Sequence, residues 1–480
     1  MSVARTVSWN VLVQLGSRAA QLALSGIATL VIVRSLGPAQ YGQYAFVIAL
    51  ISVCGLIAEG GIDRIVTRDI SVNVDEEATL LPLGILTHMI FGLLAAIAAV
   101  VAAFVLHLDN VVRVGVTVAS VIFFFDGVSS VGVIFQARLA MQYDALSMIG
   151  GKVVFAAVVA LSAWRQAPVL AYVLAPVSSS LVMALLALYF SRRFTHLRWQ
   201  VDVVRLRRLM SDCIPSGLAL FIAVLYLKLD GVLLGILVGS TALGLYSAAY
   251  RPVEYLLLAA SVIVSPVYPL LSRTFGTDPE RFLMIYQRSF LTLLLGFTPI
   301  IALSVVFAPQ LLGLVFGPEY VTSATPYRLL MLVLPLLACN GWQALAMLSA
   351  NRQAITVRID AVGLVVNITA NLLLIPRLGA VGCALAALMT ALVVSSSGNV
   401  AARRIAGASF PGAVLLRLVA VGVIGATVMR LASPLIWPVA GALGIAVYVA
   451  LLPVFHLVDL DEIRLLLSPP RSAIAASDVP

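Results

Sequence analysis

Residues 36–46, LGPAQYGQYAF, and residues 238–248, VGSTALGLYSA, share a Gly-x4-Gly-x-Tyr pattern. The three fixed positions recur 202 residues later (239 − 37), pairing Gly37 with Gly239, Gly42 with Gly244, and Tyr44 with Tyr246. Each copy lies in a short turn between two long apolar runs. A repeat placed in this way predicts two related bundles of membrane helices that face one another across a shared cavity, which is a transporter architecture.

The composition excludes a water-soluble globule. Of the 480 residues, 62% are hydrophobic and 11% are charged, and the mean hydropathy is +1.09. Soluble domains are about 45 to 50% apolar, and one helix needs roughly 20 apolar residues to cross a bilayer. We therefore predict an all-α polytopic membrane protein with about fourteen transmembrane helices.

The repeat divides these helices into two lobes with the same orientation. We expect a six-helix lobe over residues 1–190, a basic cytoplasmic connector over 191–210 and a second six-helix lobe over 211–400. Residues 401–480 are expected to add two helices and a short cytoplasmic tail. Because the cavity would lie between two lobes of one chain, a monomer is expected.

Basic residues are unequally divided between the two sides of the predicted spans. The side that holds both termini collects eighteen arginines, whereas the other side collects six: Arg34, Arg113, Arg165, Arg328, Arg377 and Arg430. This bias predicts cytoplasmic termini in a cytoplasmic (inner) membrane protein. The net charge of +9 is thereby explained as a topology signal and an attraction to anionic membrane lipids, and no nucleic-acid partner is expected.

The cysteines give no sign of a metal centre. Cys54, Cys213, Cys339 and Cys383 lie in or beside predicted spans without paired spacing, so they are expected to be small packing residues. We predict no catalytic residues, no metal site, no cofactor and no enzymatic activity.

Six basic residues fall inside predicted spans. Arg358 and Arg417 lie near cytoplasmic ends, from which they can reach the interface. The other four lie deeper: Arg18, Lys152, Lys228 and Arg251. Each would cost roughly 2.5 to 3.5 kcal/mol if it faced lipid at the bilayer centre. We therefore predict that these four line a water-filled cavity that favours anions.

Three carboxylates offer an alternative, in which each base is locked in an ion pair. Lys228 lies two residues from Asp230, Arg251 lies three from Glu254, and Asp126 is available in the fourth predicted span, roughly 111–134. Asp126, Asp230 and Glu254 are also candidates to carry a coupling proton or sodium ion, because carboxylates inside membranes commonly mark ion pathways. The spacing is compatible with both interpretations.

Asn367 and Asn371 lie one helical turn apart in the eleventh predicted span. They are candidates to face the cavity as sugar ligands. Hydrogen bonding between helices is the favoured interpretation.

The chain resembles the multidrug/oligosaccharidyl-lipid/polysaccharide exporter superfamily, above all its polysaccharide transporter branch of O-antigen and exopolysaccharide repeat-unit flippases. Six stretches carry this resemblance: RSLGPAQYGQYAF (34–46), AEGGIDRIVTRDIS (58–71), VGSTALGLYSAAYRP (238–252), FGPEY (316–320), LSANRQ (348–353) and NITANLLLIPRLGAVGCALA (367–386). They follow one another in order through both halves of the chain.

The resemblance implies a V-shaped pair of lobes of the MATE-like fold that carries an undecaprenyl-diphosphate-linked glycan from the inner to the outer leaflet. Basic residues in the lumen would then meet the diphosphate; Arg18, Lys228 and Arg251 are candidates by position. Arg64, in the DRIVTRD element, is a candidate for the cytoplasmic mouth, with topogenic anchoring as the alternative. The implied partners are the lipid-linked glycan, membrane lipids, a polysaccharide polymerase and assembly proteins.

The driving force follows from charge. A diphosphate with about two negative charges is repelled by an inside-negative potential. Its outward movement is therefore favoured by roughly 2.3 kcal/mol per charge per 100 mV. Flipping driven by the potential alone is therefore expected.

Three other functions would share part of this sequence pattern. A multidrug exporter of the same superfamily would need unpaired acids for cationic drugs, whereas this chain leans basic. A lipid II flippase would share the fold and a cationic cavity. The sequence distinguishes it from a polysaccharide repeat-unit flippase only by a weak likeness of motifs. A membrane glycosyltransferase would need paired carboxylates in a sizeable external loop, which the sequence lacks.

Overall fold

The computed structural model describes residues 3–72, 76–195, 197, 199, 202–264, 267–410, 412–434 and 436–458. Within these ranges there are helices and no strands. The first half contains α1 (Val3–Glu59), α2 (Ile62–Val72), α3 (Glu77–Val105), α4 (Asn110–Ala119), α5 (Ile122–Ser129), η2 (Ser130–Gly132), α6 (Val133–Ala137), α7 (Met141–Trp164) and α8 (Val169–Ser191). The second contains α9 (Val203–Leu237), α10 (Ser240–Val264), α11 (Val267–Thr274), α12 (Pro279–Val306), α13 (Ala308–Val315), η3 (Pro318–Ser323), α14 (Ala324–Ser349), α15 (Gln353–Leu378), α16 (Ala380–Ala406), α17 (Gly412–Leu431) and α18 (Trp437–Val454).

The first glycine of each repeated motif forms a turn between two long helical segments. Gly37 interrupts α1 with a φ of 65°, so that this element is two segments with a sharp turn between them. Gly239 has a φ of 111° and separates α9 from α10. A positive φ is costly for a residue with a Cβ atom, which explains glycine at both positions.

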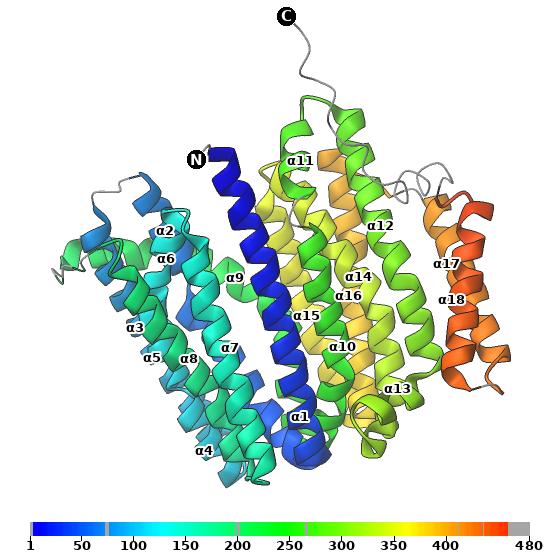
Figure 1. Ribbon diagram of the computed structural model, residues 1–480, viewed down its shortest axis with the longest axis horizontal. Coiled ribbons are helices and arrows are strands. Elements are labelled where there is room, and N and C mark those ends of the chain that lie inside the picture. The colour runs from blue at the N-terminus through cyan, green and yellow to red at the C-terminus, as the bar shows by residue number, and fades with distance from the viewer. Residues whose placement is uncertain are drawn as a thin grey trace, which may run out of the picture.

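The helices form two groups that diverge from each other (Figure 1). One group, drawn in cyan at the left, contains α3, α4, α5, α7 and α8; the other, in green to orange, contains α10, α12, α14, α15 and α16. The first segment of α1 runs between them, and the turn at its lower end lies close to α10. Helices α17 and α18 lie outside the second group, where α17 packs on α12.

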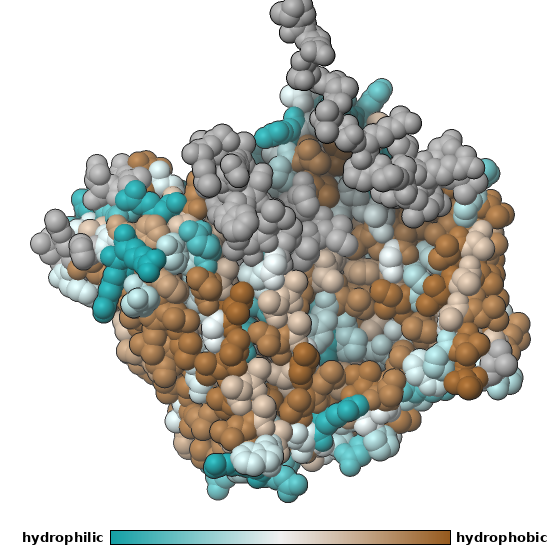
Figure 2. Space-filling view, in the orientation of Figure 1, coloured by the Kyte–Doolittle hydropathy of each residue, from teal (hydrophilic) through white to brown (hydrophobic). Residues whose placement is uncertain are grey.

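The apolar surface has the form expected for a membrane protein. Figure 2 shows hydrophobic side chains across the middle of the molecule and hydrophilic patches toward its two ends. Eleven helical stretches are long and apolar enough to cross a membrane, the first of which, Gly16–Val72, contains the turn at Gly37. Helices α9 and α10 cover the first two predicted spans of the second lobe, roughly 211–238 and 241–270, but they are not among the eleven. The total of fourteen stays a prediction.

Helix α9 connects the lobes. Its first turns carry Leu209 and Cys213 into a buried cluster with residues of α2, α3 and α6, whereas its later turns pack on α15. The basic connector is thus helical from Val203 onward. Cys54, Cys213 and Cys383 are buried, as packing residues would be, and Cys339 is partly buried.

Candidate functional site

Charged side chains from α9 and α10 meet at the junction of the two lobes. The Nζ of Lys228 lies 3.2 Å from Oε1 of Glu254, and the Nη1 of Arg251 lies 2.7 Å from Oε2 of the same carboxylate. The Nε of Arg251 also donates to the hydroxyl of Tyr41, on the second segment of α1, at 3.1 Å. Two cations share one carboxylate, so this junction cluster (Tyr41, Lys228, Arg251 and Glu254) keeps one net positive charge.

The junction cluster borders a cavity of about 80 Å³ that is walled by both lobes. The charged residues that line it are Lys228, Arg251, Glu254 and Asp230. The uncharged lining residues are Ala45, Ile48, Ala49 and Ser52 of α1, Gly231 of α9, and Tyr246, Ser247 and Tyr250 of α10. The side chains of Lys228 and Arg251 are 40% and 25% exposed, so both cations can meet a ligand in the cavity.

Helix geometry decides which acid pairs with which base. Arg251 and Glu254 lie three residues apart on one face of α10, and the predicted ion pair forms. The predicted partnership of Lys228 with Asp230 is wrong, because Lys228 binds Glu254 instead. Residues two apart do not share a helix face, so Asp230 does not pair with Lys228 although both border the same cavity.

Asp230 is buried, with 7% of its surface exposed, in a second polar cluster. The Nδ2 atoms of Asn367 and Asn371 both donate to its Oδ1 at 2.8 Å, and the Tyr246 hydroxyl lies 3.5 Å from its Oδ2. The predicted hydrogen bonding between helices is confirmed, since these contacts tie α9 to α10 and α15. A cavity of about 20 Å³ adjoins the carboxylate and is also bordered by Thr390.

The third predicted carboxylate lies elsewhere. Asp126, on α5, accepts a hydrogen bond from the hydroxyl of Ser180 on α8. It therefore joins two helices inside the first lobe and takes no part in the junction cluster.

Three predicted basic residues also lie outside the junction cluster. Arg18 is exposed on the first segment of α1. Lys152 is half-buried on α7, and its amine lies 5.5 Å from the ring centroid of Phe155. Arg64 is exposed on α2, a short amphipathic helix. The structure brings together two of the five predicted basic ligands, Lys228 and Arg251.

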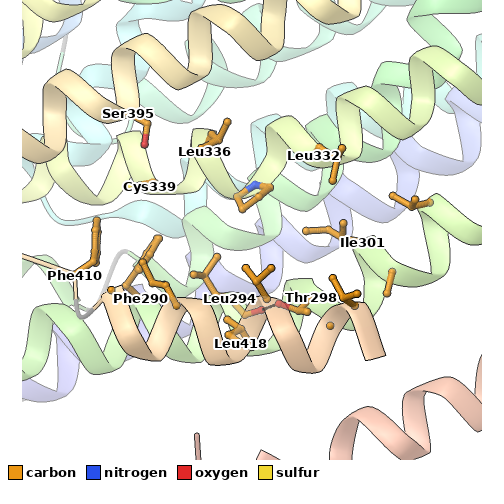
Figure 3. Close-up of a pocket in the computed structure, with 18 of the residues that line it drawn as sticks. Phe290, Leu294, Thr298, Ile301, Leu332, Leu336, Cys339, Ser395, Phe410 and Leu418 are labelled. Atoms are coloured by element: carbon orange, nitrogen blue, oxygen red, sulfur yellow. Dashed lines mark hydrogen bonds between the residues drawn. The ribbon is translucent and has the colours of Figure 1, made fainter. Parts of the chain in front are cut away.

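A lateral groove of about 650 Å³ lies between α12, α14, α16 and α17 (Figure 3). Its lining is mainly apolar, with Leu294, Ile301, Leu332 and Leu336 beside Phe290 and Phe410. Thr298 and Ser395 add polar groups. Val419 of α17 is 61% exposed at its border. In a bilayer this groove would face hydrocarbon.

A comparison with protein families decides the family of the chain. The family described as "Polysaccharide biosynthesis protein" matches residues 3–275, which is more than half of the sequence. The chain belongs to this family. A comparison with curated protein sequences finds no match for this family member.

Solved structures of low sequence identity share the fold of this polysaccharide biosynthesis protein. Lipid II flippase MurJ in an inward closed conformation is 13% identical, with a TM-score of 0.77 over 95% of this chain and 100% of that one. An inward-facing multidrug resistance MATE family transporter of the MOP superfamily is 15% identical, with a TM-score of 0.63 over 82% and 98%. A MOP superfamily transporter from Pyrococcus furiosus is also 15% identical, with a TM-score of 0.57 over 82% and 96%. These structures confirm the predicted helical membrane fold.

Sequence reasoning missed Tyr41 as a member of the junction cluster. The signal was present, because Tyr41 lies within the repeated motif that led to the fold. Its role depends on the packing of one motif copy against the other, which spacing alone does not give.

Proposed function

We propose that this protein is a flippase that moves a polyprenyl-diphosphate-linked glycan from the inner to the outer leaflet by alternating access. The observation that carries the proposal is the junction cluster, in which Lys228 and Arg251 share the single carboxylate of Glu254. The two cations of the junction cluster suit an anionic head group, and neutralisation of Asp230, which borders the same cavity, would leave that cavity with one excess positive charge. Guanidinium and ammonium groups are the usual partners of phosphate oxygens.

The diphosphate would replace part of the Glu254 contact. Arg251 is held by Tyr41 as well as by Glu254, so its guanidinium stays oriented while one N–H group turns toward the ligand. Lys228, the more exposed cation, offers a mobile ammonium group from the opposite helix. One oriented cation and one mobile cation fit a cargo that must bind in the cavity and then be released.

The lateral groove supports a lipid cargo. Its lining of leucine, isoleucine, valine and phenylalanine suits a branched polyprenyl chain, and its border with the lipid-exposed side of α17 gives the chain a route from the bilayer. The tail would thus stay in an apolar environment while the head group enters the polar junction.

Asp230 is the best placed of the three acids to couple an ion to flipping. Glu254 is already neutralised by two cations and Asp126 lies within the first lobe, whereas the groups that bind Asp230 are two amides and a phenol, all uncharged. A proton or a sodium ion would neutralise the buried carboxylate. Since Asp230 borders both the 20 Å³ and the 80 Å³ cavities, its charge state would be felt at the junction.

The proposed setting is the cytoplasmic membrane with both termini in the cytoplasm, as the distribution of arginines favours. There the protein would receive lipid-linked units from cytoplasmic assembly proteins and release them to an external polymerase. A lipid II flippase is the alternative, and it differs in cargo rather than in the chemistry of the junction.

Mass spectrometry of lipid-linked saccharides tests the function. Cells depleted of the protein are compared with cells that carry Arg251→Gln or, as a matched control outside the junction, Arg64→Gln. Accumulation of a polyprenyl-diphosphate glycan on depletion and with Arg251→Gln, but not with Arg64→Gln, supports the proposal and identifies the cargo. Accumulation of lipid II identifies the alternative. If no lipid-linked saccharide accumulates on depletion, the flippase function is refuted.

A further inference from the structure

The two copies of the repeated motif contact each other through their second glycines. A Cβ atom at Gly42 would overlap the carbonyl oxygen of Ser240 and lie 3.0 Å from the amide nitrogen of Gly244. A Cβ atom at Gly244 would overlap the carbonyl oxygen of Pro38 and lie 2.9 Å from the amide nitrogen of Gly42. Ser240 follows Pro38 by the same 202 residues (240 − 38), so each copy presents the same surface to the other.

This contact joins the lobes at one end of the molecule, where the turns at Gly37 and Gly239 lie. We name it the outer end, because the proposed cytoplasmic termini would put it on the external side. Two further bridges cross there. Arg34 donates to the carbonyl oxygens of Val315, at 2.9 Å, and Leu314, at the C-terminal end of α13. The Tyr320 hydroxyl donates to the carbonyl oxygen of Val33 at 3.1 Å. A cation at a helix C-terminus is favourable, but Arg34 is exposed, so this bridge can be broken.

A polar recess of about 780 Å³ opens at the outer end. The motif's first turn, residues 34–40, forms one wall, and Gly313 with residues 316–320 forms the other. The glycine contact is adjacent both to this recess, which residues 34–40 line, and to the junction cluster, because Tyr41, next to Gly42, binds Arg251. A ligand in the junction cavity is thereby linked to the outer end through two adjacent residues.

We infer that the duplicated motif is a self-complementary outer gate. Gly42 and Gly244 allow the second segment of α1 and the start of α10 to meet at backbone distance when the gate is closed. Backbone atoms make the contact at Gly42 and Gly244, so moving the two helices apart at this point breaks no ion pair. The inference rests on the proposed alternating access, but it is independent of the cargo.

The gate predicts an unusual effect of a single methyl group. In the closed form, alanine at position 42 would collide with backbone atoms, which cannot move away as a flexible side chain can. In an open form the collision is absent, and alanine favours a helix over glycine. Gly42→Ala should therefore shift the population toward an open outer end instead of unfolding the helices.

Pulsed electron paramagnetic resonance between spin labels at the outer end tests the gate. Labels are placed at Gln40→Cys and Leu314→Cys, both exposed, in a Cys339→Ala background, since the other three native cysteines are buried. We expect one short-distance population in the parent protein and a longer one with Gly42→Ala. Gly296→Ala, on α12, is the matched control, because a Cβ atom there meets nothing within 4 Å.

A second variant keeps the test decisive if Gly42→Ala does not fold. Arg34→Ala removes the exposed bridge without touching the glycine contact and should also increase the longer-distance population. Unchanged distances in every folded gate variant would overturn the gate. Because the measurement needs no substrate, a failure of the gate is distinguishable from a failure of the proposed cargo.

Discussion

Neutralising Glu254 should tighten the binding of a diphosphate while it weakens the fold. A phosphate oxygen bound to Arg251 and Lys228 would lie about 6 Å from the Glu254 carboxylate, since contacts of roughly 3 Å on either side of each cation add up. A unit repulsion at that distance is about 0.7 to 3 kcal/mol for effective dielectric constants of about 80 and 20. Glu254→Gln removes it, which corresponds to roughly tenfold tighter binding.

The same change costs stability. The 2.7 Å contact with Arg251 is charge-assisted and worth about 2 kcal/mol, whereas Lys228 is 40% exposed and adds less. Glutamine keeps one acceptor oxygen, so a fall in Tm of a few degrees is expected rather than unfolding. Affinity and stability should thus move in opposite directions.

Titration calorimetry with geranylgeranyl diphosphate on the purified protein measures the affinity. Glu319→Gln is the matched control, because it removes the same charge from the outer recess. Tighter binding with Glu254→Gln alone, together with a steeper dependence on salt, is the expected result. Equal or weaker binding with Glu254→Gln would refute the assignment of the junction cluster as the diphosphate site.

Three further outcomes are expected. Arg251→Gln should weaken binding of geranylgeranyl diphosphate roughly 10- to 100-fold in the same titration, because a charge-assisted hydrogen bond is worth about 1.5 to 3 kcal/mol. Leu336→Trp should fill the lateral groove and lower the affinity for a long polyprenyl diphosphate but not for inorganic diphosphate. Asp230→Leu should lower the unfolding free energy by about 1 to 3 kcal/mol per stranded amide at Asn367 and Asn371, measured by thermal denaturation against Asp230→Asn.

The sequence predicts the fold because its strongest signals are physical constraints on the backbone. Long apolar runs can only be membrane helices, and the paired glycines are demanded by a positive φ at Gly37 and Gly239 and by backbone contact at Gly42 and Gly244. Such requirements leave glycine at fixed positions in the sequence, so the repeat can be recognised from residue spacing without knowing which residues pack together.

The partners of the charged residues in the candidate site are predicted less completely. A charge inside a membrane span indicates that the side chain needs a polar or oppositely charged partner, but it does not identify that partner. The i, i+3 rule gives the pair of Arg251 with Glu254, since both lie on one helix. The contact of Lys228 with Glu254 joins two helices, and so do the bonds of Asp230 with Asn367 and Asn371. Their register depends on helix packing, which a single sequence does not specify.

The membrane potential and an ion gradient make separable predictions for the driving force. Two negative charges that leave an inside-negative cell gain about 4.6 kcal/mol at 100 mV, roughly a thousandfold bias, without any ion. If the potential suffices, imposing it on proteoliposomes should drive flipping by the parent protein and by Asp230→Asn alike.

The carboxylate of Asp230 joins three helices, so this residue has a structural role whether or not it couples an ion to flipping. Asp230→Asn, at nearly equal volume, keeps hydrogen-bonding capacity and removes the charge that a proton or a sodium ion would neutralise. Flipping that ignores the potential but stops when a proton or sodium gradient is collapsed would refute the electrical account. Loss of that gradient dependence in Asp230→Asn would then make Asp230 the coupling site, because the change removes a charge while it leaves a polar group among the same partners.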